Sequence, residues 1–158
     1  MNLKQITKKD QLSLKKLYFD SIISIDERIY SLEQKRAWAS QAWDNKNFNL
    51  SINEGKGWLI NDDDDKLIAF AIRYPNNRIS LLYCKADSQR KGYGTKLIHK
   101  LENEAKDEGN TFLTTEASLI SYKLFLKNKW KIIRKEKIII KNIIFERYKM
   151  KKIFNLIN

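Results

Sequence analysis

The sequence predicts a mixed α/β domain in which a central twisted sheet is flanked by helices. Two observations favour this class. Segments with the period-two pattern of strands alternate along the chain with segments that show the 3.6-residue period of amphipathic helices. With 158 residues, of which 42% are hydrophobic, the chain is long and apolar enough to enclose one sizeable core. We therefore expect a single domain over residues 1–150, followed by a basic and apolar tail over residues 151–158.

The N-terminal third is predicted to contain one strand and two helices. Residues 2–6 are expected to form a short first strand. Thr7 and Ser31 each begin a capping box, and apolar residues at helical spacing follow both. The two boxes therefore predict two successive helices. Trp38, which lies at helical spacing in the second one, is expected to belong to the core.

Three strands are predicted in the middle of the chain, over residues 56–61, 66–74 and 79–84. The first two flank four consecutive aspartates, residues 62–65. Metal-binding loops space their carboxylates so that the oxygens converge, whereas consecutive side chains splay apart. We therefore expect a solvated hairpin turn here, and no metal ion.

A basic turn, Gln89-Arg90-Lys91-Gly92-Tyr93-Gly94, leads from the third of these strands into a helix that Thr95 opens. The first N–H groups of a helix have no internal partners, and the helix dipole adds partial positive charge to them. The two glycines lack the Cβ atoms that would keep a phosphate away from these amides. The turn therefore indicates a site for a phosphorylated ligand, although its spacing is neither that of a P-loop nor that of a dinucleotide fingerprint. A basic helix cap without a ligand is the alternative.

The C-terminal third is predicted to complete the sheet. The helix after the basic turn is expected to stop at Gly109, and a strand over residues 111–116 follows it. One more helix comes next. Residues 132–140 and 143–150 then alternate as the two strands of a long hairpin.

The net charge of +12 is concentrated near the C-terminus. Residues 123–152 carry twelve lysines and arginines against Glu136 and Glu146, which places +10 in this segment. Such a field attracts polyanions, which include nucleic acid, an anionic membrane and coenzyme A. We favour the interpretation that most of these lysines solvate a surface.

The single cysteine, Cys84, excludes an internal disulfide and is compatible with a reducing compartment. No apolar stretch in the sequence is long enough to span a bilayer. We therefore expect a cytoplasmic protein that does not bind a membrane.

The segment Gln-Arg-x-Gly-x-Gly, placed between a strand and a helix, resembles the pyrophosphate loop of the GNAT superfamily of acyl-CoA-dependent N-acetyltransferases. The predicted order of elements resembles the fold of this family over nearly the whole chain. The resemblance implies transfer of an acetyl group from acetyl-CoA to a primary amine within a ternary complex. It also implies that the two N-terminal helices lie over the acceptor site.

The same resemblance implies which residues hold acetyl-CoA. The strand before the loop would bind the acetyl and pantetheine portions through its main chain, and the loop would bind the pyrophosphate. The implied set is Leu82, Tyr83, Cys84, Gln89, Arg90, Lys91, Gly92, Tyr93, Gly94, Thr95 and Ser118.

The catalytic residues match the family less well. Family members commonly carry a tyrosine on the penultimate helix that protonates the departing thiolate, and Phe125 occupies this position. Tyr122, one helical turn earlier, is the expected substitute. Glu116 is the candidate general base, and capping of the following helix is its alternative role. Cys84 is interpreted as a structural thiol, and His99 as a solvent-facing residue.

Two other functions stay open at this point. Phe125 would suit a non-catalytic acyl-CoA-binding module. The basic C-terminal segment would suit a nucleic-acid-binding protein, although its strand-like alternation lacks a recognition helix. For an enzyme, the acceptor would be a small-molecule or peptide amine, and a homodimer is compatible with the sequence.

Overall fold

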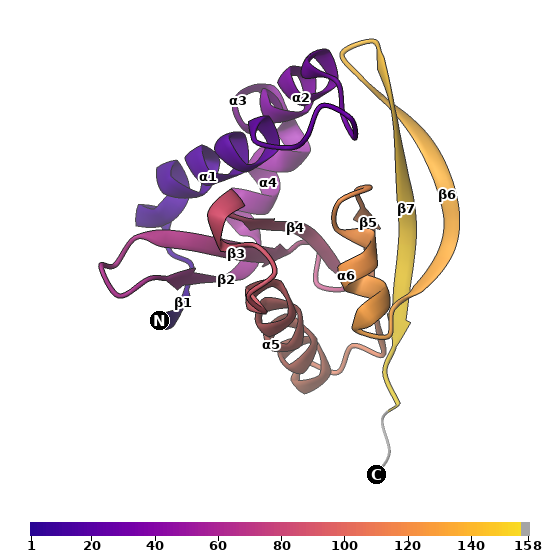
Figure 1. Ribbon diagram of the computed structural model, residues 1–158. Coiled ribbons are helices and arrows are strands. Elements are labelled where there is room, and N and C mark those ends of the chain that lie inside the picture. The colour runs from indigo at the N-terminus through magenta and orange to yellow at the C-terminus, as the bar shows by residue number, and fades with distance from the viewer. Residues whose placement is uncertain (156–158) are drawn as a thin grey trace.

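The computed structural model describes residues 1–155 and confirms the mixed α/β class. Its strands are β1 (Asn2–Gln5), β2 (Lys56–Asn61), β3 (Leu67–Arg73), β4 (Arg78–Cys84), β5 (Phe112–Ala117), β6 (Lys131–Ile140) and β7 (Ile143–Ile153). Its helices are α1 (Gln11–Ile23), α2 (Leu32–Ala39), α3 (Gln41–Asp44), α4 (Lys46–Glu54), α5 (Tyr93–Asp107) and α6 (Tyr122–Lys127), with short 3-10 helices η1 (Lys8–Asp10) and η2 (Ala86–Ser88). The strands form one sheet in the order β1-β2-β3-β4-β5-β7-β6, in which only β4 and β5 are parallel (Figure 1).

Helices cover both faces of this sheet. α1 to α4 gather on one face, and α5 lies against the other (Figure 1). Along β3, Ala69 and Ala71 pack in the cluster that contains α5, whereas Phe70 and Ile72 pack in the cluster that contains α1. A strand that is covered on both faces must be apolar at nearly every position, which explains the unbroken apolar run in β3.

The N-terminal helices differ from the prediction. The second predicted helix is divided into α2 and α3 at Ser40, and α4 was not predicted. Its apolar residues Phe48, Leu50 and Ile52 alternate as they would in a strand. The side chain of Asn45, however, caps the helix by accepting a hydrogen bond from the Phe48 N–H group (2.9 Å). None of the helices in residues 1–155 is long and apolar enough to cross a membrane.

The predicted C-terminal tail is partly wrong. β7 continues to Ile153, and Phe154 is buried in the cluster that contains α5. Because Lys152 and Lys151 pair with Leu113 and Thr114 of β5, this stretch is part of the folded domain. Residues 156–158 of the predicted tail lie outside the described residues.

About half of the cations in the basic C-terminal segment, residues 123–152, are paired with carboxylates. Six of its cations form salt bridges, namely Arg134, Lys135, Lys141, Arg147, Lys149 and Lys152. These contacts neutralise about half of the positive charge between residues 123 and 152. The pairing supports the interpretation of a surface that is organised by its own carboxylates.

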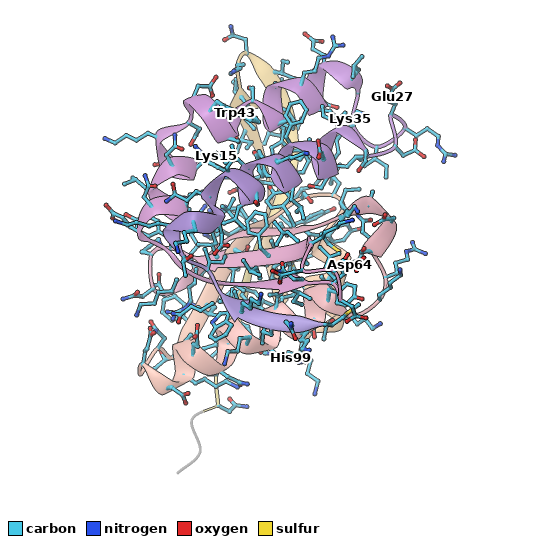
Figure 2. All side chains as sticks on the ribbon, turned by 90° about the vertical axis from the view of Figure 1, so that its left-hand side faces the viewer. Lys15, Glu27, Lys35, Trp43, Asp64 and His99 are labelled. Atoms are coloured by element: carbon cyan, nitrogen blue, oxygen red, sulfur yellow. The ribbon has the colours of Figure 1, made fainter. Side chains whose placement is uncertain are left out.

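The four consecutive aspartates form the predicted turn between β2 and β3. The Asp62 carboxylate accepts hydrogen bonds from the N–H groups of Asp64 and Lys66, and Asp65 forms a salt bridge with Lys4. Asp64 lies at the tip of this hairpin, on the surface of the molecule (Figure 2). The side chains therefore have separate partners and do not converge.

The C-terminal end of α5 is fastened to β3 by a buried arginine. The Arg73 guanidinium donates to both carboxylate oxygens of Glu108 (2.9 Å each) and to the Asn76 carbonyl oxygen (2.6 Å). Glu108 also accepts a hydrogen bond from Lys56. These cations lower the Glu108 pKa to about 2. These contacts between Glu108 and Arg73, which we call the clamp, hold the C-terminal end of α5, at the other end of the helix from the basic turn.

Candidate active site

A cleft begins where β4 and β5 separate. The two strands pair only through Arg78–Thr114 and Ile79–Thr115, at the start of β4 and in the middle of β5. Ser80 is an extra residue in the register between β3 and β4, and a bulge of this kind increases the local twist. Beyond Ser80, β4 has an open edge toward β5. Alternate main-chain N–H and C=O groups of a strand point to this side.

Leu82, Tyr83 and Cys84, the predicted acetyl and pantetheine strand, form this open stretch of β4. Leu82 and Tyr83 also line the cavity described below. Cys84 is half-buried, and burial raises its pKa to about 11. The group is therefore a neutral thiol near pH 7, which suits a structural cysteine better than a nucleophile.

The basic turn after β4 adopts a backbone conformation that favours glycine. Gly92 has a φ of +87°, and Arg90 also lies in the left-handed region with a φ of +62°. A Cβ atom added at Gly92 would meet no atom within 4 Å, so the space in front of the turn is open. Gln89, Arg90 and Lys91 are exposed beside it.

The first turn of α5 supplies free amides to this open space. The first intrahelical bond runs from the Lys96 N–H group to the Gly92 carbonyl oxygen (3.0 Å). The N–H groups of Tyr93, Gly94 and Thr95 precede it and have no intrahelical acceptor. Together with the helix dipole, these three amides form an arrangement that suits a phosphate or pyrophosphate.

Gly94 and Thr95 also join the turn to α6. A Cβ atom at Gly94 would lie 2.5 Å from Cδ2 of Leu124, so glycine allows the two helices to approach closely. The Asn128 side chain donates a hydrogen bond to Thr95 Oγ1 (3.1 Å). Because this oxygen acts as an acceptor, the hydroxyl proton of Thr95 stays available for a ligand. From the sequence, we explained Gly94 by the close approach of a phosphate to the helix amides. The structure adds a second explanation, which is the close packing of Gly94 against Leu124.

A cavity of about 280 Å³ lies beside the open edge of β4. Its walls come from β4, β5, the β6–β7 hairpin and the helices α1 to α4 and α6. Seven aromatic residues line it, namely Tyr18, Tyr30, Trp38, Phe48, Tyr83, Phe125 and Phe145. Its charged lining residues are Arg78, Glu116, Glu146 and Arg147. A concave site lined by aromatic residues and a few charged groups is typical of a small-molecule site.

Glu116, the predicted general base, lies in this cavity at the end of β5. One of its carboxylate oxygens accepts from Arg78 Nε (2.8 Å), and the other accepts from Lys149 Nζ (3.0 Å). Although burial alone would raise the Glu116 pKa, the hydrogen bonds and charges of these two cations lower it overall. The carboxylate is therefore ionised near pH 7, and its contacts tie it to β4 and β7 instead of to the start of α6.

The residues predicted near the start of α6 differ in whether they line the cavity. Ser118 lines the cavity, and its hydroxyl oxygen accepts from the Ser121 N–H group (3.1 Å). Phe125 also lines the cavity. Tyr122, the predicted acid, is not among the lining residues, and its ring packs on Tyr148 at 4.5 Å between centroids. The structure therefore brings Ser118 and Glu116 together with the cavity but leaves Tyr122 outside it.

Sequence reasoning missed Tyr30, in the segment between α1 and α2, and favoured the core for Trp38 on α2. Tyr30 is 2% exposed, and its hydroxyl oxygen accepts from the Leu119 N–H group (2.9 Å). Trp38, expected in the core, is only half-buried and lines the cavity. No motif marks Tyr30, because its hydrogen bond joins segments about ninety residues apart in the sequence. The only available signal was that the two N-terminal helices lie over the acceptor site in the resembled family.

Two other residues lie away from the cavity. His99 is exposed on α5, as predicted, and Trp43 is exposed at the opposite end of the same view (Figure 2). Neither lines the cavity.

The fold and the site together define a class of protein. The open edge of β4 carries Leu82 and Tyr83, which line the aromatic cavity, and the chain then continues from β4 to the turn with the free amides of α5. This arrangement suits a transferase whose donor has a phosphate group, an extended arm and a reactive acyl end.

Comparison with known proteins identifies the family. The family model of the acetyltransferase (GNAT) domain matches residues 27–152, and the chain belongs to this family. The protein is therefore an acyltransferase of the class that uses acetyl-CoA as cosubstrate. No curated protein matches the chain.

Solved structures agree with this assignment. A GCN5-related N-acetyltransferase from Rhodopseudomonas palustris, also described as "Aminotransferase, Class-II", is 25% identical with a TM-score of 0.89, over 97% of this chain and 95% of that chain. The paia N-acetyltransferase from Thermoplasma acidophilum, solved in complex with coenzyme A, is 19% identical with a TM-score of 0.70, over 98% and 100%. A ribosomal-protein-alanine N-acetyltransferase from Brucella melitensis is 15% identical with a TM-score of 0.68, over 98% and 100%. The last two similarities support the fold alone.

Proposed function

We propose that the protein transfers an acetyl group from acetyl-CoA directly to a primary amine while both substrates are bound. The observation that carries this proposal is the open edge of β4, which joins the free amides of α5 to the aromatic cavity. An extended pantetheine arm can add to such an edge as a further strand does, through main-chain hydrogen bonds. Its two ends would then reach the basic turn and the cavity.

The cofactor side is assigned to the residues that the sequence predicted. The main chain of Leu82, Tyr83 and Cys84 would hold the pantetheine arm, and Ser118 would bond to it from the opposite side of the cleft. The residues that would hold the pyrophosphate are Gln89, Arg90, Lys91, Gly92, Tyr93, Gly94 and Thr95. The open space at Gly92 supports this assignment, because bulky phosphate oxygens need room next to the amides.

Glu116 would act on the amine side of the reaction. The amine must lose a proton as it attacks the thioester carbonyl carbon, and Glu116 is a carboxylate that lines the cavity. Its lowered pKa makes it a weak base, so it would orient the amine and pass the proton to water. Main-chain N–H groups on the open edge of β4 would stabilise the oxyanion that forms on the carbonyl oxygen.

The acceptor would enter the cavity between the N-terminal helices and the β6–β7 hairpin. The aromatic residues there would contact its carbon skeleton, and a small-molecule or peptide amine fits this description. We also propose a cytoplasmic location, with which a single cysteine that cannot form an internal disulfide is compatible.

Two measurements test the function. Isothermal titration calorimetry should show that acetyl-CoA binds to the protein. An acceptor screen that follows release of the free CoA thiol should then find an amine that accelerates release above the rate with water alone. Binding of acetyl-CoA without acceleration by any amine would favour the non-catalytic acyl-CoA-binding module, and no binding would refute the proposal.

A further inference from the structure

The cavity contains hydroxyl groups that the assignment above does not use. Phe125, the α6 residue that borders the cavity, has no proton to donate, and Tyr122 packs on Tyr148 outside the cavity. Among the described residues, three tyrosines line the cavity, namely Tyr18, Tyr30 and Tyr83. The proton for the departing thiolate can therefore come from a part of the chain other than α6.

Hydrogen bonding separates these three tyrosines. The Tyr18 hydroxyl donates to the Trp38 carbonyl oxygen (2.8 Å), so its proton is committed to the fold. Tyr83 lies on β4, and its ring packs on Tyr18 and Trp38, with centroids 4.7 and 6.4 Å away, so the side chain is held against α1 and α2. Tyr30 differs because its oxygen accepts a hydrogen bond from an amide. A hydroxyl that accepts in this way keeps its own proton for another acceptor.

The position of Tyr30 also suits the thiolate. Its partner, the Leu119 N–H group, follows Ser118 in the turn between β5 and α6. Ser118 of this turn and Phe125 of α6 both line the cavity, and the turn follows β5 where this strand no longer pairs with β4. The Tyr30 hydroxyl therefore lies beside the turn that carries Ser118, the residue assigned above to the pantetheine arm.

Packing fixes Tyr30 in this position and keeps it protonated. Its ring lies 5.2 Å from that of Trp38 and 6.2 Å from that of Phe145, measured between centroids. Burial raises the Tyr30 pKa above its usual value of 10, so the phenol is neutral near pH 7. A rigid, neutral phenol is the form that a general acid requires.

We propose that Tyr30 is the general acid of the transfer, an inference that rests on the proposed function. The C–N bond forms as the amine attacks the carbonyl carbon, and the C–S bond then breaks. The Tyr30 phenol proton passes to the thiolate and gives free CoA. The proton released by the amine returns through water to the Tyr30 phenolate, which balances the reaction.

The first test compares Tyr30→Phe with Tyr122→Phe once an acceptor is known. We expect Tyr30→Phe to lower kcat about 10-fold to 100-fold with little change in the affinity for acetyl-CoA, and Tyr122→Phe to retain the wild-type rate. Loss of the bond to Leu119 could by itself disturb the site. The double variant Tyr30→Phe/Phe125→Tyr controls for this, because it adds a hydroxyl from α6 without restoring that bond. Partial recovery of kcat is expected, and no recovery would favour a structural role.

The second test needs no acceptor. A phenol that donates to the sulfur stabilises the thiolate, so it lowers the pKa of the bound CoA thiol. Ultraviolet absorbance of the thiolate, with the desulfo-CoA complex as blank, should show this pKa about 1 unit higher in Tyr30→Phe than in the wild type. Tyr122→Phe should give the wild-type value. An unchanged thiol pKa and kcat in Tyr30→Phe would overturn the inference while leaving the proposed function intact. Failure of wild-type protein to bind CoA would refute both.

Discussion

The cofactor side and the acceptor side of the cleft are built in different ways. On the cofactor side, the contacts come from main-chain groups of two consecutive elements, β4 and the start of α5. On the acceptor side, side chains from α1, α2, β5 and β7 converge on one cavity. Main-chain contacts need only a backbone conformation, which short motifs encode. Converging side chains need a complete tertiary structure, and each of them can be exchanged independently.

This difference makes the two sides separable by mutation. Changes on the cofactor side should alter the affinity for acetyl-CoA, and changes on the acceptor side should alter the rate of transfer. A variant that alters both quantities equally would contradict the division.

The largest effect is expected at Glu116. Glu116→Gln removes the only charge on this side chain and leaves its size unchanged, so we expect kcat to fall about 100-fold or more, within the range for one acid–base group. The affinity for acetyl-CoA should be unchanged. Steady-state kinetics with the acceptor, together with calorimetry for acetyl-CoA, measure the two quantities.

Glu136→Gln is the matched control for this variant. Glu136 also accepts hydrogen bonds from two cations, Arg134 and Arg147, and its pKa is also lowered, but it does not line the cavity. Its substitution should leave kcat within about twofold of the wild type. Equal losses in the two variants would show that both carboxylates act only by holding neighbouring strands of the sheet together.

A smaller effect is expected at Gly92. Gly92→Val places a branched side chain where the backbone has a φ of +87° and in the space in front of the α5 amides. We expect the dissociation constant for acetyl-CoA to rise about 30-fold, which corresponds to about 2 kcal/mol. Calorimetry on the folded variant measures this change.

Gly109 offers a control at the opposite end of α5. It has nearly the same conformation, with a φ of +86°, and the same open surroundings. Gly109→Val should therefore cause similar backbone strain and a similar loss of stability, but it should leave the affinity for acetyl-CoA unchanged. If both variants lost the same affinity, strain in α5 would explain the result, and the phosphate assignment of the turn would fail.

The difference between the cofactor side and the acceptor side also explains which features could be predicted from the sequence. The strands, the basic turn and α5 follow from local patterns, and the family comparison agrees with them. α4 was missed because Phe48, Leu50 and Ile52 alternate like a strand, and only the cap by Asn45 favours the helix. The role considered for Tyr122 followed from the family resemblance and from helical spacing relative to Phe125, neither of which reveals that its ring packs on Tyr148.

The residues that could not be predicted depend on contacts between distant segments. Tyr30 reaches the cavity because its hydroxyl bonds to Leu119 and its ring packs between Trp38 and Phe145. No spacing rule connects these positions. Glu116 was found because it ends a strand beside the cleft, but its pairing with Arg78 and Lys149 required the completed sheet.

The smallest effect is expected at the clamp between Glu108 and Arg73, which lies remote from both sides of the cleft. Glu108→Gln should lower the free energy of unfolding at pH 7 by about 1 kcal/mol, a figure reduced because the carboxylate is about one-third exposed. Acetyl-CoA affinity should be unchanged, because the amides at the other end of α5 keep their conformation. Urea unfolding and calorimetry measure the two quantities.

The pH dependence identifies the cause of this small effect. The Glu108 pKa is lowered from its usual 4.5 to about 2 in the folded protein, so its stabilising contribution is fully present above pH 4.5. It is lost as the pH falls toward 2, where the carboxylate becomes protonated and no longer pairs with the buried Arg73 charge. The difference in stability between the wild type and Glu108→Gln should therefore shrink over this interval and disappear near pH 2. A difference that stayed constant from pH 7 to pH 2 would instead assign the effect to packing, and the clamp would not be electrostatic.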